Sequence, residues 1–187
     1  MLRLAAALFA LLLLTPAQAT EAGWALLREG GHVVLIRHAM APGTGDPPNF
    51  DIEKCSTQRN LSERGKLQAR KMGALFAARA ATTERVLSSR YCRCLETARL
   101  AFGESLVEES EPLGRLSMTK DDDVASKAQL AAMLELIRGF SGSGNLVLVT
   151  HQENIAALTG VSPREGEAVI VRPEGEGLHV TGRIIFN

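Results

Sequence analysis

Two short apolar runs that each end in histidine constrain the fold more than any other feature of this chain. The first spans residues 33–38 with the sequence VVLIRH, and the second spans residues 146–151 with the sequence LVLVTH. Runs that are short, rich in β-branched residues and apolar throughout are typical of strands buried on both faces of a parallel sheet. Ligands of open α/β sheets bind outside the carboxyl ends of the strands. We therefore expect His38 and His151 at one sheet edge, facing a common pocket.

The rest of the chain alternates between predicted helices and strands. Helices are predicted at residues 23–28, 63–80, 91–102, 124–140 and 152–158, and further strands at 85–89, 168–171 and 178–186. For the second helix, residues 60–63 (NLSE) place a capping residue ahead of the first turn, and the apolar stripe contains Leu67, Met72, Leu75 and Phe76. Residues 41–48 have the composition of a turn-rich loop, and residues 103–123 are predicted to be irregular and acidic. This alternation predicts an α/β domain, a three-layer sandwich with a mainly parallel central sheet.

The amino-terminal residues have the pattern of a secretory signal peptide. Arg3 precedes an apolar run of 11 residues, Leu4–Leu14, and the sequence Ala17-Gln18-Ala19 follows. The apolar run is much shorter than the roughly 20 residues that a membrane-spanning helix needs. We expect cleavage near Ala19, a single mature domain over residues 20–187, and a periplasmic or secreted location.

The charge balance argues against some classes of partner. The chain carries 21 basic and 21 acidic residues, so its formal net charge is zero. Nothing in this balance indicates a nucleic-acid or anionic-membrane partner, and no second apolar stretch is long enough to span a membrane.

The three cysteines, Cys55, Cys92 and Cys94, would enter an oxidising compartment in an exported chain. Their odd number leaves at least one thiol outside any intramolecular disulfide. We expect one disulfide, between Cys55 and either Cys92 or Cys94, and one buried thiol. A metal site is not favoured, because a structural zinc ion takes four ligands.

Three segments carry residues suited to binding and transferring an anion. Arg37-His38 ends the first strand, residues 88–98 (SSRYCRCLETA) lead from a strand into a helix, and Thr150-His151-Gln152 ends another strand. Histidine can act as a nucleophile, and the guanidinium of arginine is a planar fork of donors for phosphate. Helix amino termini add backbone N–H groups. Arg90 and Arg93 have the plainer interpretation of a solvated helix start, but the three segments together predict a phosphate pocket.

The same segments resemble the motifs of the histidine phosphatase superfamily, also called phosphoglycerate mutase-like. Residues 35–39 (LIRHA) are similar to its Arg-His-Gly signature, and residues 60–65 (NLSERG) to its N-x-L-[ST]-x-x-G segment. Residues 88–98 are similar to its S-S-x-x-x-R-x-x-[QE]-T-A segment, and Thr150-His151 to its second histidine. The resemblance implies that His38 is the nucleophile that becomes phosphohistidine. It also implies that Arg37, Arg93 and His151 bind the phosphoryl oxygens, with no metal or organic cofactor.

Three further residues are predicted to bind substrate, and two positions depart from the family pattern. Arg59, Asn60 and Gln152 are expected to border the pocket. Ala39 replaces the usual glycine after the nucleophile. Arg115 occupies the position at which many members have the glutamate that protonates the leaving oxygen. The sequence offers Glu111, Asp121, Asp122 or Asp123 as substitutes, and the acid stays unassigned.

The predicted function is an exported phosphomonoesterase that acts through phosphohistidine. The nearest resemblance is to small periplasmic members such as the heptose-phosphate phosphatases of the lipopolysaccharide core, which implies a phosphorylated small molecule or an envelope glycan as substrate. The segment between Ala98 and Ala125 is too short for the insertion of a mutase. A phosphatase of phosphohistidine proteins stays open. The alternative from another class is a non-catalytic phosphate-binding envelope protein. The sequence predicts no oligomeric state.

Overall fold

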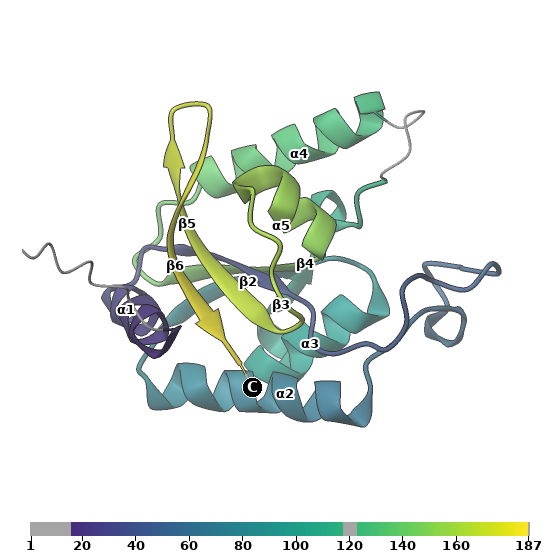
Figure 1. The fold of residues 1–187 in the computed structure, drawn as a ribbon, viewed down its shortest axis with the longest axis horizontal. Helices are drawn as coiled ribbons and strands as arrows, with labels where there is room; N and C mark the ends of the chain where they lie inside the picture. Colours follow the sequence, from purple (N-terminus) through teal and green to yellow (C-terminus); the bar gives the residue numbers. More distant parts are fainter. Residues whose placement is uncertain (1–15, 118–122, 187) are drawn as a thin grey trace, which may run out of the picture.

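The computed structural model describes residues 16–117 and 123–186, and its centre is a six-stranded sheet with the strand order β3-β2-β4-β1-β5-β6 (Figure 1). The strands are β1 (Val33–Arg37), β2 (Thr83–Ser88), β3 (Val107–Glu109), β4 (Asn145–Thr150), β5 (Glu167–Glu174) and β6 (Gly177–Ile185). Strands β3, β2, β4 and β1 pair in parallel, while β5 pairs antiparallel with both β1 and β6. The prediction of a mainly parallel sheet is confirmed.

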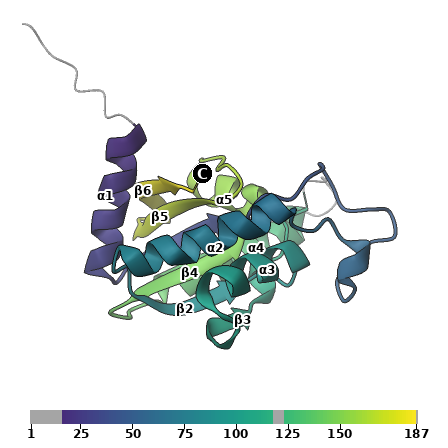
Figure 2. The ribbon, with the colours of Figure 1, turned by 90° about the horizontal axis from the view of Figure 1, so that it is seen from below.

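Helices cover both faces of the sheet and complete the predicted three-layer sandwich (Figures 1 and 2). The helices are α1 (Pro16–Glu29), α2 (Glu63–Ala78), α3 (Cys92–Phe102), α4 (Asp123–Arg138) and α5 (Gln152–Thr159). Successive side chains of a strand point to opposite faces. In β1, Val34 and Ile36 therefore join the core formed with α1, α2 and α3. Val33 and Leu35 join the core formed with α4 and α5.

One region of the predicted secondary structure is wrong. Residues 103–123 are predicted to be irregular, yet residues 103–117, which the structure describes, contain β3 and two 3-10 turns, Glu104–Leu106 and Glu111–Leu113. Strand β3 has only three residues, and it forms because Val86–Ser88 of β2 offers a free edge in parallel register. Local propensity carries little signal for a strand that depends on such a partner.

The apolar stripe predicted for α2 is correct for Met72 and Phe76 but wrong for Leu67. Met72 and Phe76 are buried, whereas the Leu67 side chain is 64% exposed. Leu67 lies two residues before the buried Ala69, which places it about 200° around the helix from that residue. The buried face of α2 follows Ala69, and Leu67 lies on the solvent face.

The predicted signal peptide falls largely outside the described residues. Its apolar run, Leu4–Leu14, is not among them, and α1 begins at Pro16 and ends at Glu29 instead of covering only 23–28. Within residues 16–117 and 123–186, no helix has both the length and the apolar character needed to cross a bilayer.

Candidate active site

The carboxyl ends of β1 and β4 lie side by side and bring the two histidines together. Arg37 is in register with Thr150, and the His38 backbone N–H donates to the Thr150 carbonyl at 3.1 Å. The imidazole rings of His38 and His151, which follow the two strands, have centroids 5.7 Å apart. The expectation that both histidines occupy one sheet edge is confirmed.

His38 is buried and held as a neutral imidazole. Its Nδ1 lies 2.8 Å from the Ala39 carbonyl oxygen, which can only accept, so Nδ1 carries the proton and Nε2 is unprotonated. Burial lowers the pKa of His38 to about 3, and the nearby positive charges of Arg93, Arg59 and Arg37 add to this effect. The ring therefore presents an unprotonated Nε2 at neutral pH, which is the state a nucleophile requires.

His151 is buried against side chains of residues 89–94, which lead from β2 into α3. Its Nε2 lies 3.0 Å from Ser89 Oγ and 3.6 Å from Cys94 Sγ, and its Nδ1 lies 3.4 Å from Arg93 Nη2. The Tyr91 ring packs edge-on at a centroid distance of 4.7 Å. Burial lowers the pKa of His151 well below its usual value, and the charge of Arg93 acts in the same direction. These contacts fix the ring in one orientation beside Arg93.

Three arginines surround the two histidines. Arg93 is completely buried in the first turn of α3, and Arg37 donates from Nη1 to Gln152 Oε1 at 2.5 Å and to the Pro163 carbonyl at 3.0 Å. Arg59 donates to the carbonyls of Ala41 and Gly43, and its Nη2 lies 3.5 Å from His38 Nε2. Burial lowers the pKa of Arg37 and of Arg59. Such a concentration of guanidinium groups is suited to an oxyanion with several oxygens.

The Nε atoms of these arginines give a second sign of an anion site. In all three arginines, Nε is buried and has no hydrogen-bond partner within the described part of the chain; these are Arg37, Arg59 and Arg93. Buried donors are normally paired. Unpaired donors on three neighbouring guanidinium groups are therefore unusual, and they fit a pocket built for an acceptor-rich ligand.

A cavity of about 230 Å³ opens onto His38. It is lined by Arg37, His38, Gly43, Thr44, Arg59, Arg115, Gln152 and Glu153. The structure thus brings Arg59 and Gln152, two of the three residues predicted to bind substrate, to the same cavity as the nucleophile candidate. A space of this size is suited to a phosphoryl group and part of the group that carries it.

The structure does not bring Asn60 to the cavity. Its side-chain amide donates to the carbonyls of Cys55 and Gln58, at 2.6 and 3.0 Å, so it braces the loop that precedes α2. Gly65 belongs to the same motif as Asn60. A glycine is required there because a Cβ would lie 2.1 Å from the Met40 carbonyl oxygen. This close approach holds the start of α2 against the segment that follows His38.

Arg90 and Arg93, three residues apart, have opposite environments. Arg90 is exposed and forms ion pairs with Glu53 and Glu109, as expected for a solvated helix start. Arg93 lies at the site. Thr97, one turn further along α3, accepts from the Ala39 N–H at 2.9 Å and donates to the Arg93 carbonyl at 2.7 Å. This threonine ties the segment after His38 to the helix that carries Arg93.

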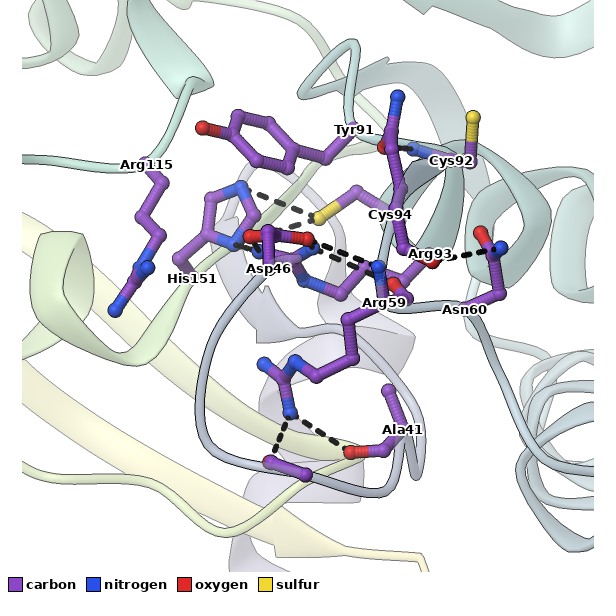
Figure 3. Close-up of polar contacts among 12 residues, drawn as sticks. Ala41, Asp46, Arg59, Asn60, Tyr91, Cys92, Arg93, Cys94, Arg115 and His151 are labelled. Atoms are coloured by element: carbon purple, nitrogen blue, oxygen red, sulfur yellow. Dashed lines mark hydrogen bonds and ion pairs between the residues drawn. The ribbon is translucent and has the colours of Figure 1, made fainter. Parts of the chain in front are cut away.

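The sequence did not single out two carboxylates of the site. The Asp46 carboxylate accepts from Arg93 Nη1 at 2.8 Å and Nη2 at 3.3 Å, and from the Arg59 backbone N–H at 3.0 Å (Figure 3). Glu165 lies 3.7 Å from Arg37 and 3.8 Å from Arg59. Asp46 sits in a Pro- and Gly-rich loop and Glu165 lies two residues after Pro163, so neither belongs to a periodic pattern or a motif that would have marked it.

Of the candidates for the missing acid, the structure describes only the Glu111 side chain, and it does not line this cavity. Glu111 lines a different hollow, with Pro112, Ala125 and Gln129. Asp121 and Asp122, together with the Asp123 side chain, lie outside the described residues. Arg115 lines the cavity, and its Nε and Nη2 donate to Glu153 Oε1 at 3.0 and 2.9 Å.

Of the two disulfides that the sequence allowed, the structure has Cys55–Cys92, with a Cα–Cα distance of 5.6 Å. Cys94 is the buried free thiol, and burial raises its pKa to about 12. A thiol in this state is a poor nucleophile. The disulfide joins the loop before α2 to the start of α3, next to Arg93.

No group of three or more His, Cys, Asp or Glu side chains is placed to hold a metal ion in residues 16–117 and 123–186. The cationic character of the site comes from its arginines.

Comparison with known proteins gives matches among solved structures only, because no family model and no curated protein sequence matches this chain. Alpha-ribazole phosphatase from Shigella flexneri has a TM-score of 0.58 and 18% identity, over 83% of this chain and 96% of that chain. Phosphoserine phosphatase from Entamoeba histolytica has a TM-score of 0.57 and 13% identity, over 82% and 96%. The protein histidine phosphatase SixA, in a complex with tungstate, has a TM-score of 0.52 and 18% identity, over 82% and 96%. The fold of this chain is therefore the phosphoglycerate mutase-like fold of the histidine phosphatases.

Proposed function

We propose that the chain is an exported phosphomonoesterase that transfers a phosphoryl group to His38 and then to water. One observation carries this proposal: His38, unprotonated at Nε2, lines a cavity with Arg37 and Arg59, and the ring of His151, which contacts Arg93, has its centroid 5.7 Å from that of His38. An unprotonated nucleophile is thereby surrounded by the charges that a phosphate needs.

The reaction has two steps. In the first, His38 Nε2 attacks phosphorus, the P–N bond forms and the P–O bond of the ester breaks. In the second, water attacks the phosphohistidine, the P–N bond breaks and inorganic phosphate leaves. Arg37, Arg59 and Arg93 stabilise the charge on the phosphoryl oxygens in both transition states, because fixed donors in a water-poor site need little reorganisation. His151 is held beside Arg93 and is the fourth residue proposed to bind the phosphoryl oxygens.

The proposed substrate is a phosphorylated small molecule or an envelope glycan. Two of the similar structures are named as phosphatases of small phosphorylated molecules, alpha-ribazole phosphatase and phosphoserine phosphatase, and the cavity of about 230 Å³ suits a small group. The Cys55–Cys92 disulfide supports the periplasmic or secreted location, because disulfides persist in oxidising compartments. One similar structure is named as a protein histidine phosphatase, so a phosphohistidine protein is the alternative substrate to test beside these.

One observation favours a second function, a phosphate-binding protein without catalysis. Glu111, the expected acid whose side chain the structure describes, lines a different hollow, and Arg115 lines the cavity. Such a protein would bind phosphate through the same arginines but form no covalent adduct.

The test is the hydrolysis of an aryl phosphate by the wild-type protein, by His38→Ala and by a control, His179→Ala. His179 is half exposed on β6 and far from the cavity in sequence and fold. We expect His38→Ala to lose activity by roughly 10³-fold or more, since the nucleophile is removed, and His179→Ala to behave as wild type. Labelled phosphoenzyme is trapped by denaturation at alkaline pH, which preserves phosphohistidine. A wild-type protein that binds phosphate but forms no adduct would contradict the enzyme proposal and support the binding protein.

A further inference from the structure

Arg115 lines the cavity together with His38, but the proposed reaction does not use it. Its side chain is 34% exposed, so its guanidinium lies at the open part of the site. Its charge acts on the buried groups: burial and the charge of Arg93 lower the pKa of His151 most, and Arg115 adds to this effect. Figure 3 shows the Arg115 side chain on the same side of the site as His151 and Tyr91. A further cation therefore borders the space in which the phosphoryl group is expected to bind.

Two consecutive residues of α5 hold two arginines at the cavity. Gln152 Oε1 accepts from Arg37 Nη1 at 2.5 Å, and Glu153 Oε1 accepts from Arg115. Glu153 also acts on Arg37: burial lowers the pKa of Arg37, and the charges of Glu165 and Glu153 oppose this effect. One turn of α5 thus places Arg115 next to an arginine that is proposed to bind the transferred phosphoryl group. A second anionic group beside that phosphoryl group would meet Arg115.

Glu153 leaves Arg115 with donors for a ligand. Nε and Nη2 of Arg115 both donate to the same oxygen, Glu153 Oε1, at 3.0 and 2.9 Å. Within residues 16–117 and 123–186, Nη1 of Arg115 has no hydrogen-bond partner. A guanidinium carries five N–H donors in a planar fork, and that fork matches the oxygens of a phosphate. Arg115 can therefore bind an anion while Glu153 holds it in place.

The described lining of the cavity offers this extra cation but no unpaired carboxylate. Among the residues that the structure describes, Glu153 is the only carboxylate in the lining, and it accepts two hydrogen bonds from Arg115, as an ion-paired carboxylate does. The alkoxide that leaves an alkyl ester needs a proton donor. A phosphate that leaves a diphosphate is already stable as an anion. The lining therefore favours a leaving group that carries negative charge and binds Arg115.

We propose that the site also hydrolyses diphosphates, with Arg115 as the residue that binds the phosphate that leaves. This further activity rests on the proposed transfer of a phosphoryl group to His38. His38 Nε2 attacks the terminal phosphorus, the P–N bond forms, and the P–O bond to the bridging oxygen breaks. The bridging oxygen keeps the electron pair and leaves as part of a phosphate anion held by Arg115, so this step needs no proton. Water then attacks the phosphohistidine, the P–N bond breaks, and the second phosphate leaves with both protons of the water.

The test compares kcat/KM for pyrophosphate, 4-nitrophenyl phosphate and glycerol phosphate at neutral pH. Phosphate and nitrophenolate are leaving groups of similar basicity, but only phosphate offers anionic oxygens to Arg115. The glycerol alkoxide needs a proton. We expect wild type to prefer pyrophosphate to 4-nitrophenyl phosphate by roughly 10- to 100-fold, the value of a hydrogen bond to a charged group, and to turn over glycerol phosphate slowest. Arg115→Gln should reduce this preference to less than about 3-fold, whereas Arg115→Lys, which keeps a charge, should retain part of it.

Arg85→Gln is the matched control, because Arg85 also donates from Nε and Nη2 to a glutamate, Glu108, but is exposed on β2 outside this cavity. It should keep the preference of wild type. The proposal is overturned if wild type turns over pyrophosphate no faster than 4-nitrophenyl phosphate, or glycerol phosphate as fast as pyrophosphate. It is also overturned if Arg115→Gln lowers kcat/KM equally for all three substrates, since a merely structural role predicts that result. Failure of the proposed function has a separate signature, because wild type then forms no phosphoenzyme even from 4-nitrophenyl phosphate.

Discussion

The site around His38 has two walls, and they are held in place by different interactions. One wall, the sheet-edge wall, consists of Arg37, His38, Arg93 and His151, which follow or begin regular elements. Main-chain pairing fixes it: β1 and β4 are in parallel register up to Arg37 and Thr150. The Ser89 N–H also donates to the Val149 carbonyl, which aligns the start of α3 with the same edge. Each residue of this wall is almost completely buried except Arg37.

The other wall, the loop wall, consists of residues 41–60 and contributes Asp46 and Arg59. Side chains and one disulfide hold it instead of a sheet. Gln58 donates to the carbonyls of Asp51 and Ile52 and accepts from the Cys92 N–H, and Cys55 is covalently joined to Cys92. The comparison indicates that main-chain pairing fixes the charged groups of the sheet-edge wall, whereas the loop wall depends on side-chain contacts and one disulfide.

The largest effect is expected from a change in the sheet-edge wall, Arg93→Lys. Lysine keeps one positive charge but loses the planar fork that contacts both Asp46 and His151. We expect kcat/KM to fall by roughly 10²- to 10³-fold, measured with an aryl phosphate. Arg90→Lys, an exposed change three residues earlier, is the control and should stay within about 2-fold of wild type. A loss below about 5-fold for Arg93→Lys would mean that the sheet-edge wall and the loop wall contribute similarly to kcat/KM.

The next effect concerns the loop wall, through the double variant Cys55→Ser and Cys92→Ser. The disulfide spans a sequence separation of 37 residues, so its loss should lower the free energy of unfolding by roughly 3–4 kcal/mol in a chain-entropy description. Urea unfolding measures this. Activity should fall mainly through a higher KM, since His38 and Arg93 keep their supports. A fall in kcat with no change in KM would show that the loop positions the nucleophile as well.

The pH dependence of the free energy of unfolding tests the sheet-edge wall alone, because both buried histidines belong to it. The folded-state pKa of His38 is about 3, below the ordinary value of 6.5. Below pH 6.5, His38 is protonated in the unfolded chain but stays neutral in the folded chain. The free energy of unfolding therefore decreases as the pH falls. One such group contributes about 1.4 kcal/mol per pH unit. Urea unfolding between pH 7 and 4 should show a shallower slope for His38→Ala than for wild type, and an unchanged slope would contradict the buried neutral state.

The smallest effect is expected for Gln152→Ala, compared with Asn60→Ala. Gln152 lines the cavity and accepts from Arg37 Nη1, so its loss should raise KM by about 3- to 10-fold with little change in kcat. Asn60 braces the loop wall through backbone carbonyls, so its loss should shift the urea midpoint more than KM. Initial rates and urea unfolding on both variants decide this. A larger rise in KM for Asn60→Ala than for Gln152→Ala would mean that Asn60 contributes to substrate binding after all.

The sequence by itself determined the sheet and the chemistry at its edge. Apolar, β-branched runs are local signals for buried strands, and strands that run in parallel must bring their carboxyl ends together. This reasoning was enough to predict that His38 and His151 lie at one edge, and the motif around Arg93 added the arginine. The capping role of Ser62 was equally local, since its Oγ accepts from the Gly65 N–H within the same turn.

Only the tertiary structure decided the loop wall. The choice of Cys92 over Cys94 for the disulfide, the turn of Asn60 away from the cavity and the pairing of Asp46 with Arg93 all depend on contacts between segments far apart in the chain. A loop without periodicity has no local pattern that fixes where its side chains point, because each direction is set by whichever donor or acceptor the folded core places nearby. The carboxylate that pairs with Arg93 was hidden from the sequence for that reason.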